Sequence, residues 1–386
     1  MGTASRGFQV FAKPAGSQCN LRCRYCYYLG KGHPGPPGQT QRMSREMLER
    51  YVAQHIAASP DEVIRFSWHG GEPTLLGVDY FQTILQIQRR LTPAGRRIAN
   101  GMQTNGVLLD AEWARFLSQE GFAVGLSLDG PQARHDQHRV TRDGQPTFPE
   151  VLRGYTLLRE HGVPTDVLCV VGSHNVHHPG EVYGFLKQIG AAYVTFLPMV
   201  EPRPDMPQGV SAHSVPADAW GDFLCAIFEE WVAHDIGRVQ VQLFEEAVRT
   251  AFGQEHSLCI FRPVCGDIPV VDWDGRFYAC DHYVDAAHCY GNIRDTPLAD
   301  LIDSRAQRAF GLAKSEHLPR YCQSCEVLAM CHGECPRNRF AFAPDGEAGL
   351  CYLCPGYKRF FHHAKPFVDA VAAEWRRQQP TTSVSL

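Results

Sequence analysis

Three closely spaced cysteines near the start of the chain are the residues that most directly suggest chemistry. They are Cys19, Cys23 and Cys26, in the pattern C-x3-C-x2-C. An odd number of thiols cannot all be used in disulfides, so the spacing favours a shared metal centre. A structural zinc normally takes four protein ligands, whereas a four-iron cluster held by three cysteines leaves one iron free to bind another molecule. Both interpretations are open at this point.

Eight further cysteines in the last third of the chain have spacings that suggest additional metal centres. One pattern is Cys265-x9-Gly275-x4-Cys280, and a second begins at Cys322 and has gaps of two, five and three residues. The candidate ligands are Cys259, Cys265, Cys280, Cys322, Cys325, Cys331, Cys335 and Cys354. They fit two centres of four thiolates each, either iron–sulfur clusters or zinc sites. On spacing alone, Cys351 could replace Cys354.

Two other short stretches carry residue types that suit a reactive site. His69 is followed by two glycines, the second of which is Gly71, and then by Glu72. Glycines let the backbone approach a ligand closely, although such pairs are often only tight turns. Asp281 directly follows Cys280, so a metal on that thiolate would fix the carboxylate, which could then accept a proton.

Alternating strand-like and helix-like stretches must position these residues. Apolar strands are predicted at residues 8–12, 63–68, 98–103, 123–128, 165–171 and 193–197. Helical patterns lie between or after them at residues 44–58, 80–91, 111–119, 148–161 and 181–189. Such repeats build a parallel sheet covered by helices, and right-handed crossovers curl it into a barrel or part of one. The predicted fold is therefore α/β, with a partial (β/α)6 TIM-like barrel whose functional residues follow the strands.

The second half of the chain does not continue the alternation of strands and helices. Helices are predicted at residues 216–234, 242–252 and 366–377, and a hairpin at 268–272 and 276–279 is turned by Asp274-Gly275. A Gly- and Pro-rich connector is expected at 33–39 and a loose tail at 381–386. We predict three regions: a barrel over 1–215, linking helices over 216–257, and a cysteine-rich domain over 258–386.

Composition and charge exclude several classes of function. The 386 residues are 44% hydrophobic and 20% charged, with a net charge of −4, so no basic surface for nucleic acid is expected. The N-terminal residues do not read as a signal peptide, and no apolar run is long enough to span a bilayer. Fifteen cysteines without an export signal are expected to stay reduced. The predicted location is therefore the cytoplasm, with no membrane partner.

The cysteine loop together with the Gly-Gly-Glu-Pro stretch resembles the radical S-adenosylmethionine (SAM) superfamily. The resemblance implies that the open iron of a [4Fe-4S] cluster on the first three cysteines chelates SAM. It further implies that the backbone at Gly71 and Glu72 holds the amino group of SAM. Ser127 and Arg139 are expected to contact its hydroxyl and carboxylate groups, since an arginine fork matches a carboxylate. Tyr25 is expected near the adenine, and so is Val200.

The later cysteines resemble the SPASM domain, a cysteine-rich extension of radical SAM enzymes that modify peptides and proteins. By this resemblance, one auxiliary [4Fe-4S] cluster takes Cys259, Cys265, Cys280 and Cys335. The other takes Cys322, Cys325, Cys331 and Cys354. The resemblance favours Cys354 over Cys351 and implies three [4Fe-4S] clusters in all.

From about Phe8 to Phe361 the motifs occur in the order found in anaerobic sulfatase-maturating enzymes, which the chain resembles as a whole. That family oxidises a Cys or Ser of a sulfatase to Cα-formylglycine. The resemblance implies that a 5′-deoxyadenosyl radical removes the Cβ hydrogen, that Asp281 takes the thiol or hydroxyl proton, and that an auxiliary cluster accepts the electron. His69 and Tyr28 are the expected substrate contacts. His69 departs from the family, many members of which have glutamine there.

The resemblance also implies binding partners, and two alternative functions remain open. The expected substrate is an unfolded or nascent sulfatase with a Cys/Ser-x-Pro/Ala-x-Arg segment, and the expected electron donor is a flavodoxin or ferredoxin. One rival is a SPASM enzyme that installs thioether or carbon–carbon crosslinks in a ribosomal peptide. The other is a zinc-stabilised scaffold without chemistry, which would leave the Gly-Gly-Glu-Pro stretch without a role.

Overall fold

The computed structural model describes residues 2–29, 41–203, 205–206 and 209–378. The chain forms two compact units, each built from two separate segments. The first unit contains residues 1–170 and 265–313, and the second contains residues 171–264 and 314–386. The predicted connector at 33–39 and tail at 381–386 lie outside the described residues. The three predicted regions stay a prediction, because spatial units need not follow sequence order.

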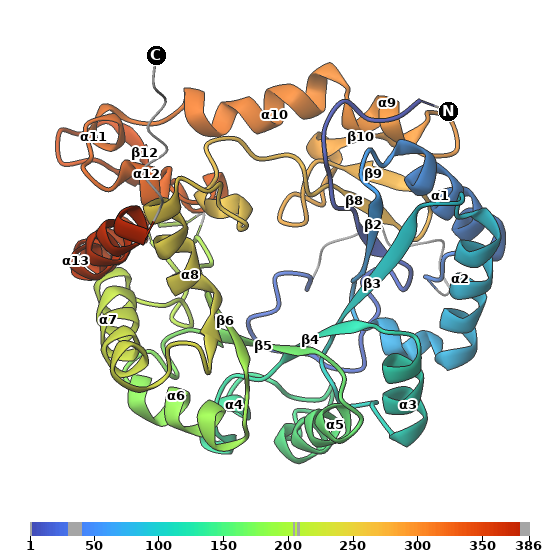
Figure 1. Ribbon diagram of the computed structural model, residues 1–386, viewed down its shortest axis with the longest axis horizontal. Coiled ribbons are helices and arrows are strands. Elements are labelled where there is room, and N and C mark those ends of the chain that lie inside the picture. The colour runs from blue at the N-terminus through green and yellow to red at the C-terminus, as the bar shows by residue number, and fades with distance from the viewer. Residues whose placement is uncertain (1, 30–40, 204, 207–208, 379–386) are drawn as a thin grey trace. The chain divides into compact units, whose positions relative to one another are not determined.

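The first unit is organised around a parallel sheet. Its strands are β1 (Phe11–Lys13), β2 (Val63–Trp68), β3 (Arg97–Thr104), β4 (Ala123–Ser127) and β5 (Thr165–Val171). They pair in sequence order from β1 to β4, and β5 follows β4. Its longer helices lie along the outer side of the strands (Figure 1): α1 (Arg45–Ala58), α2 (Val78–Leu91), α3 (Ala111–Gln119) and α5 (Phe148–Glu160). This α/β arrangement was predicted, and the boundaries agree within three residues.

Local chemistry explains where two of these helices begin. The Ser44 side chain accepts a hydrogen bond from the Met47 amide and so caps α1. Asp110 caps α3 by accepting from the amides of Glu112 and Trp113. Each cap satisfies backbone amides that the first turn of the helix would otherwise leave without a partner.

The predicted hairpin is present, and it joins the main sheet. It consists of β8 (Val270–Asp272) and β9 (Arg276–Tyr278), and Gly275 supplies a positive φ of 87° at the turn. Strand β8 runs parallel to β1, with Lys13 opposite Asp272, and β10 (Cys289–Asn292) extends the other edge of β9. The sequence did not predict this pairing. It brings the chain that follows β9 to the end of β1.

The second unit is mainly helical. Its parallel strands are β6 (Tyr193–Pro198) and β7 (Gln240–Val241), and its helices are α6 (Pro179–Gln188), α7 (Ala217–His234), α8 (Gln242–Arg249), α11 (Arg320–Gln323), α12 (Leu328–Cys331) and α13 (Cys354–Gln378). The shorter elements of the chain are α4 (Gln132–His135), α9 (Leu298–Ile302), α10 (Arg305–Glu316), β11 (Ala341–Phe342), β12 (Ala348–Leu350), and the 3-10 turns at 73–76, 250–252, 259–261, 286–288 and 336–338.

The last helix was predicted to start at residue 366, and this was wrong, because α13 begins at Cys354. Pro366, the predicted first residue, lies inside the helix. An interior proline costs about 3 kcal/mol. Burial of the stripe Tyr357, Phe360, Phe361, Ala364 and Val368 outweighs it, since each large apolar side chain contributes roughly 1.5–3 kcal/mol.

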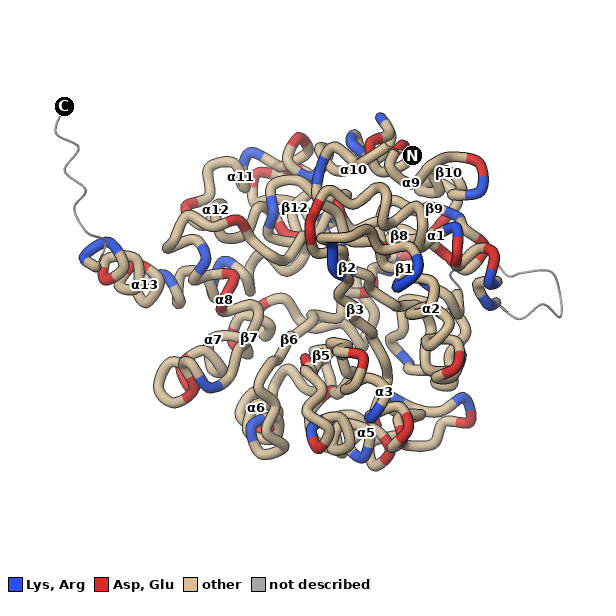
Figure 2. Tube along the Cα trace, turned by 45° about the vertical axis from the view of Figure 1, so that its right-hand side comes forward, with Lys and Arg blue, Asp and Glu red and all other residues tan. Residues whose placement is uncertain are grey.

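Charge is distributed without a dominant sign. Figure 2 shows Lys and Arg interspersed with Asp and Glu along the helices of each unit. Among the helices in the described ranges, none combines the length and the apolar character that a bilayer-spanning segment requires.

Candidate active site

The loop that carries Cys19, Cys23 and Cys26 leaves β1 and is tied to a later segment of the first unit. The amide of Arg22 donates to the carbonyl of Val140 at 2.9 Å, and that of Arg24 donates to His138 at 2.9 Å. Burial, with smaller contributions from the charges of Glu72, Cys23 and Cys26, raises the pKa of Cys19 to about 11. The fold therefore brings the three thiols close to one another, and that they hold a cluster stays a prediction.

Arg139 is the positive charge beside these thiols. Burial raises the pKa values of Cys23 and Cys26, while the guanidinium of Arg139 lowers both. Arg139 is only 6% exposed, and its Nε has no hydrogen-bond partner in the described part of the chain. A buried guanidinium with an unused donor can take a carboxylate, and its charge favours thiolates that bind metal.

The Gly-Gly turn after β2 packs directly on the cysteine loop. The amide of Gly71 donates to the carbonyl of Gly16 at 2.8 Å, and the Glu72 amide donates to the carbonyl of Gln18 at 2.7 Å. A Cβ on Gly71 would stand 2.0 Å from the carbonyl oxygen of Gln18, which no side chain tolerates. These glycines therefore permit close approach to the cysteine loop as well as to any ligand.

The side chain of Glu72 is occupied by the protein. It is 1% exposed. Its Oε1 accepts from the Thr74 and Thr104 hydroxyls, at 2.6 and 2.7 Å, and its Oε2 accepts from the Asn105 amide at 2.7 Å. This carboxylate connects the turns after β2 and β3. The prediction that the backbone at Gly71 and Glu72 holds SAM stays a prediction.

Tyr25, Asp129 and Arg139 form a buried polar cluster at the end of β4. The Tyr25 hydroxyl donates to Asp129 Oδ2 and accepts from the Arg139 Nη1 at 2.8 Å. Asp129 is fully buried, and its Oδ1 accepts from the Val170 amide at 3.0 Å. Ser127, on the same strand, accepts from the side chain of Gln103 at 3.1 Å. Asp129 thus orients both predicted SAM contacts, Tyr25 and Arg139.

Asp281 lies at the end of β1, where three side chains donate to its carboxylate. Its carboxylate accepts from Lys13 Nζ, from the Tyr27 hydroxyl, and from the Tyr28 hydroxyl at 2.9 Å. The Lys13 ammonium also lies 3.6 Å from the centroid of the Tyr28 ring. Burial alone would raise the pKa of Asp281, but Lys13, His69 and the donated hydrogen bonds hold it well below its usual range. The carboxylate is therefore ionised at neutral pH.

His69 belongs to the same group. Its ring stacks on Phe11 at 3.9 Å between centroids. Burial lowers the pKa of His69 to about 4, although Asp281 works in the opposite direction, so the imidazole is neutral at pH 7. A neutral imidazole can both donate and accept a hydrogen bond. The predicted substrate residues His69 and Tyr28 thus lie around Asp281, and their contact with substrate stays a prediction.

Sequence analysis missed Lys13 and Tyr27 at this site. Lys13 is 1% exposed at the end of an apolar strand, and buried lysines are almost always paired. A lysine at the end of an apolar strand was visible in the sequence. Its partner, Asp281, was not, because the pairing of β1 with β8 was not predicted. Val200 lies in the second unit, where it is buried, and its contact with adenine stays a prediction.

In the second unit, one pocket is lined by the four cysteines predicted to hold an auxiliary cluster: Cys322, Cys325, Cys331 and Cys354. Burial raises the pKa of Cys331 to about 12 and that of Cys354 to about 11, and the sulfur of Cys322 adds to both shifts. Cys351 also lines the pocket, but its thiol donates to Glu334 Oε2 at 3.3 Å. This bond supports Cys354 as the ligand, which stays a prediction.

The cysteines of the other predicted auxiliary cluster are divided between the units: Cys265 and Cys280 in the first, Cys259 and Cys335 in the second. Their grouping stays a prediction. Within the described ranges, no three Cys, His, Asp or Glu side chains are arranged to hold a single metal ion. A four-iron cluster spreads its thiolates over separate irons, whereas zinc gathers them around one.

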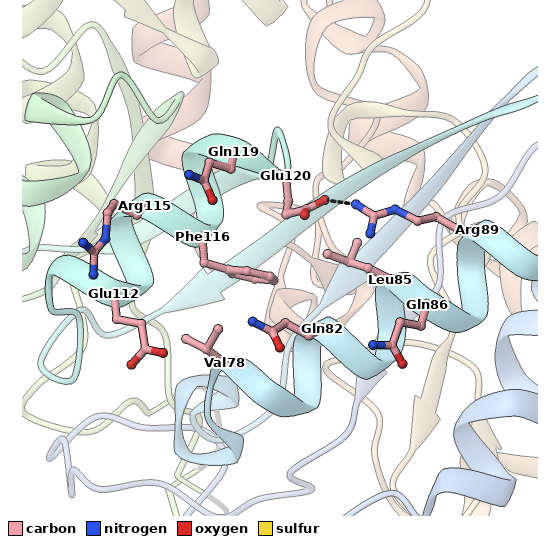
Figure 3. Close-up of a pocket in the computed structure, with 10 residues that line it drawn as sticks. All are labelled: Val78, Gln82, Leu85, Gln86, Arg89, Glu112, Arg115, Phe116, Gln119 and Glu120. Atoms are coloured by element: carbon pink, nitrogen blue, oxygen red, sulfur yellow. Dashed lines mark hydrogen bonds and ion pairs between the residues drawn. The ribbon is translucent and has the colours of Figure 1, made fainter.

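A polar groove of about 490 Å³ lies between α2 and α3 on the first unit, away from these residues. Figure 3 shows Arg89 reaching across it to Glu120, with Gln82, Gln86 and Phe116 along its sides. None of the predicted site residues lines this groove.

Comparison with known proteins defines the class. Residues 14–186 match the model of the radical SAM superfamily, and residues 259–326 match that of the SPASM iron–sulfur cluster-binding domain. The protein is a radical SAM enzyme with a SPASM domain, as predicted from the cysteine spacings. Radical SAM and SPASM domains imply [4Fe-4S] clusters and SAM as cofactors.

Full-length relatives narrow the family. The chain is 36% identical to the serine-type anaerobic sulfatase-maturating enzyme of Bacteroides thetaiotaomicron, over 97% of this chain and 94% of that one. It is 32% identical to the cysteine-type enzyme of Clostridium perfringens strain 13, over 94% of this chain and 98% of that one. The solved structure of native anSMEcpe with bound AdoMet and the Cp18Cys peptide matches with a TM-score of 0.86 at 31% identity, covering 96% of this chain and 100% of that one. The chain belongs to the anaerobic sulfatase-maturating enzymes, and the predicted family and fold class are confirmed.

Proposed function

We propose that this enzyme oxidises a Cys or Ser side chain of a sulfatase to Cα-formylglycine. The observation that carries the proposal is the ionised carboxylate of Asp281, fixed by Lys13, Tyr27 and Tyr28 beside neutral His69. Asp281 directly follows a predicted cluster ligand, so proton and electron can leave the substrate toward the same part of the protein. Membership of the family supports this reading.

The chemistry balances as a two-electron oxidation. When bound, SAM and the first cluster supply hydrogen-atom abstraction from the target Cβ, and an auxiliary cluster supplies an acceptor for the second electron. Asp281 takes the thiol or hydroxyl proton as the carbon–sulfur or carbon–oxygen double bond forms. A Ser target gives the aldehyde directly. A Cys target gives a thioaldehyde, which water converts to the aldehyde with release of hydrogen sulfide.

The low pKa of Asp281 makes it a weak base, and this constrains when it acts. A free thiol or hydroxyl would not give up its proton to such a carboxylate. After the Cβ hydrogen is gone, loss of the second electron would leave a protonated aldehyde or thioaldehyde, which is a strong acid. We therefore assign proton transfer to Asp281 after hydrogen abstraction and together with loss of the second electron, when even a weak base can take the proton.

We assign the carboxylate contact of SAM to the group of polar side chains at the end of β4, which consists of Tyr25, Asp129 and Arg139. The guanidinium of Arg139 suits the SAM carboxylate, because Asp129 and Tyr25 orient it while its Nε is left for a ligand. Ser127 suits a ribose hydroxyl, and Tyr25 and Val200 suit the adenine. The turn at Gly71 and Glu72 suits the amino group.

The proposed substrate is an unfolded sulfatase segment of the form Cys/Ser-x-Pro/Ala-x-Arg. We assign His69 and Tyr28 as substrate contacts, because both act on the carboxylate of Asp281. The proposed electron donor is a flavodoxin or ferredoxin. A reducing compartment is required for eleven metal-binding thiolates, so a cytoplasmic location remains part of the proposal.

The test uses anaerobically reconstituted enzyme with SAM, a reductant and peptides that carry Cys-x-Pro-x-Arg or Ser-x-Pro-x-Arg. Mass spectrometry should detect an aldehyde product from at least one peptide. In Asp281→Asn, which keeps the shape but not the base, we expect at least a 100-fold loss of aldehyde while SAM cleavage continues. Full aldehyde formation by Asp281→Asn would overturn the role of this carboxylate.

A further inference from the structure

A chain of buried contacts leads from Glu72 through Asn105 to the sulfur of Cys19. Glu72 follows β2 and Asn105 follows β3, which pair side by side in parallel. Glu72 is 1% exposed and Asn105 is 6% exposed, so water does not compete for their hydrogen bonds. The predicted role of this Glu, a backbone contact to SAM, does not account for its side chain.

The first link fixes the backbone of Asn105. Glu72 Oε2 accepts from the Asn105 amide at 2.7 Å, while Oε1 is held by the hydroxyls of Thr74 and Thr104. A carboxylate with donors on both oxygens has little freedom to rotate. The hydrogen bond to Glu72 therefore fixes the position of the Asn105 backbone beside the cysteine loop.

The second link fixes the orientation of the Asn105 side chain. Its Oδ1 accepts from the amide of Val107 at 3.0 Å, and because a backbone N–H can only donate, the other end of the side chain must be the NH2 group. That group has two hydrogens. One is donated to Asn20 Oδ1 at 2.8 Å and the other to Cys19 Sγ at 3.6 Å.

The sulfur of Cys19 thus receives two N–H donors, because the amide of Leu21 also points at it, at 3.4 Å. A thiolate bound to iron can only accept, so both bonds persist when the sulfur is a ligand. Hydrogen bonds to cluster sulfurs are one of the levers that set reduction potential. They favour the reduced cluster because it carries one more negative charge.

We propose that Asn105, held by Glu72, is a positioning residue that raises the reduction potential of the cluster on Cys19. The inference goes beyond the proposed function and rests only on Cys19 being a cluster ligand. Loss of the Asn105 donor should make the cluster harder to reduce. A given electron donor should therefore reduce the cluster more slowly and less completely, without any change in which peptide is oxidised.

The experiment compares wild type with Asn105→Ser and Asn105→Asp. Serine keeps a short oxygen for the Val107 amide but has no donor that reaches the sulfur, and it adds no charge. Aspartate keeps the shape and removes both donors. The matched control is Asn100→Ser, because Asn100 is a buried asparagine on β3, the strand that Asn105 follows, and its partners are Trp68 and Gln88.

The readout is the midpoint potential of the first cluster in the intact enzyme, from electron paramagnetic resonance at controlled potentials. The first cluster is identified as the one whose signal changes when SAM is added. Iron content and circular dichroism establish that each variant is loaded and folded. Because the potential is measured without peptide, the result is independent of whether the enzyme makes formylglycine.

We expect a more negative potential in both Asn105 variants and an unchanged potential in Asn100→Ser. A wild-type potential in loaded Asn105→Ser would overturn the proposal. Loss of the first cluster from both folded Asn105 variants would also overturn it, since Asn105 would then serve assembly and not potential.

Discussion

At the scale of single residues, the central feature of the site is the carboxylate of Asp281, which accepts hydrogen bonds from three side chains. Asp281 has a buried ammonium and two phenols on its oxygens, with a neutral imidazole near by. These groups stabilise its charge, and the same groups make it a weak base. Such a carboxylate is unsuited to deprotonating an ordinary thiol or hydroxyl. It is suited to receiving a proton that leaves together with the second electron, so hydrogen abstraction must come first.

Lys13 is the residue on which this balance depends most. In Lys13→Met, we expect stability to fall by about 3–5 kcal/mol, because the other member of a buried pair is left uncompensated. The pKa of Asp281 should rise, since the Lys13 charge lowers it in wild type. The carboxylate would then become protonated at a higher pH, so aldehyde formation should fail on the acidic side of neutrality, where wild type still works.

The measurements are chemical denaturation and a pH profile of aldehyde yield. Lys13→Arg is the control, because it keeps the positive charge. In wild type the stability from this ion pair is present above the ordinary pKa of an aspartate and is lost only as the pH falls through the lowered pKa of folded Asp281. If the aldehyde yield of Lys13→Met falls at the same acidic pH as that of wild type, Lys13 does not set the pKa of Asp281.

At the scale of elements, the site is a meeting of strand ends. The turn after β2 packs on the cysteine loop after β1, and the pairing of β8 with β1 brings Asp281 to Lys13. Parallel strands place their ends at one edge of a sheet, so loops far apart in sequence come into contact there. The cysteine loop is held by its neighbours' backbones and not by its own secondary structure.

Gly71→Ala tests how closely these turns must pack. The added Cβ would meet the Gln18 carbonyl at 2.0 Å, so the cysteine loop must move. We expect iron content to fall by about four per chain, the content of one [4Fe-4S] cluster, while the helical signal is retained. Gly184→Ala is the matched control, because no atom lies within 4 Å of its Cβ position. A full iron complement in Gly71→Ala would contradict this packing argument.

At the scale of the whole molecule, sequence patterns were sufficient for some features and not for others. The alternation of apolar strands and helices predicted the parallel sheet, because that pattern is local. The cysteine spacings predicted shared metal centres, because metal ligands require particular residues at particular intervals. The class of enzyme followed from the resemblance of these motifs to known families. The pairing of β8 with β1 and the length of α13 were not predictable, because both depend on contacts between distant segments. Lys13, Tyr27 and the Glu72–Asn105 link were missed for the same reason.

The central claim is that the Cβ hydrogen of a target Cys or Ser is removed and that the side chain is then oxidised beside Asp281. It is tested most directly with a peptide that carries deuterium at the Cβ of the target residue. After anaerobic turnover, mass spectrometry should find deuterium in the 5′-deoxyadenosine and an aldehyde in the peptide. In Asp281→Asn, deuterium transfer should persist while the aldehyde is lost. Aldehyde formed with no deuterium in the 5′-deoxyadenosine would contradict the account.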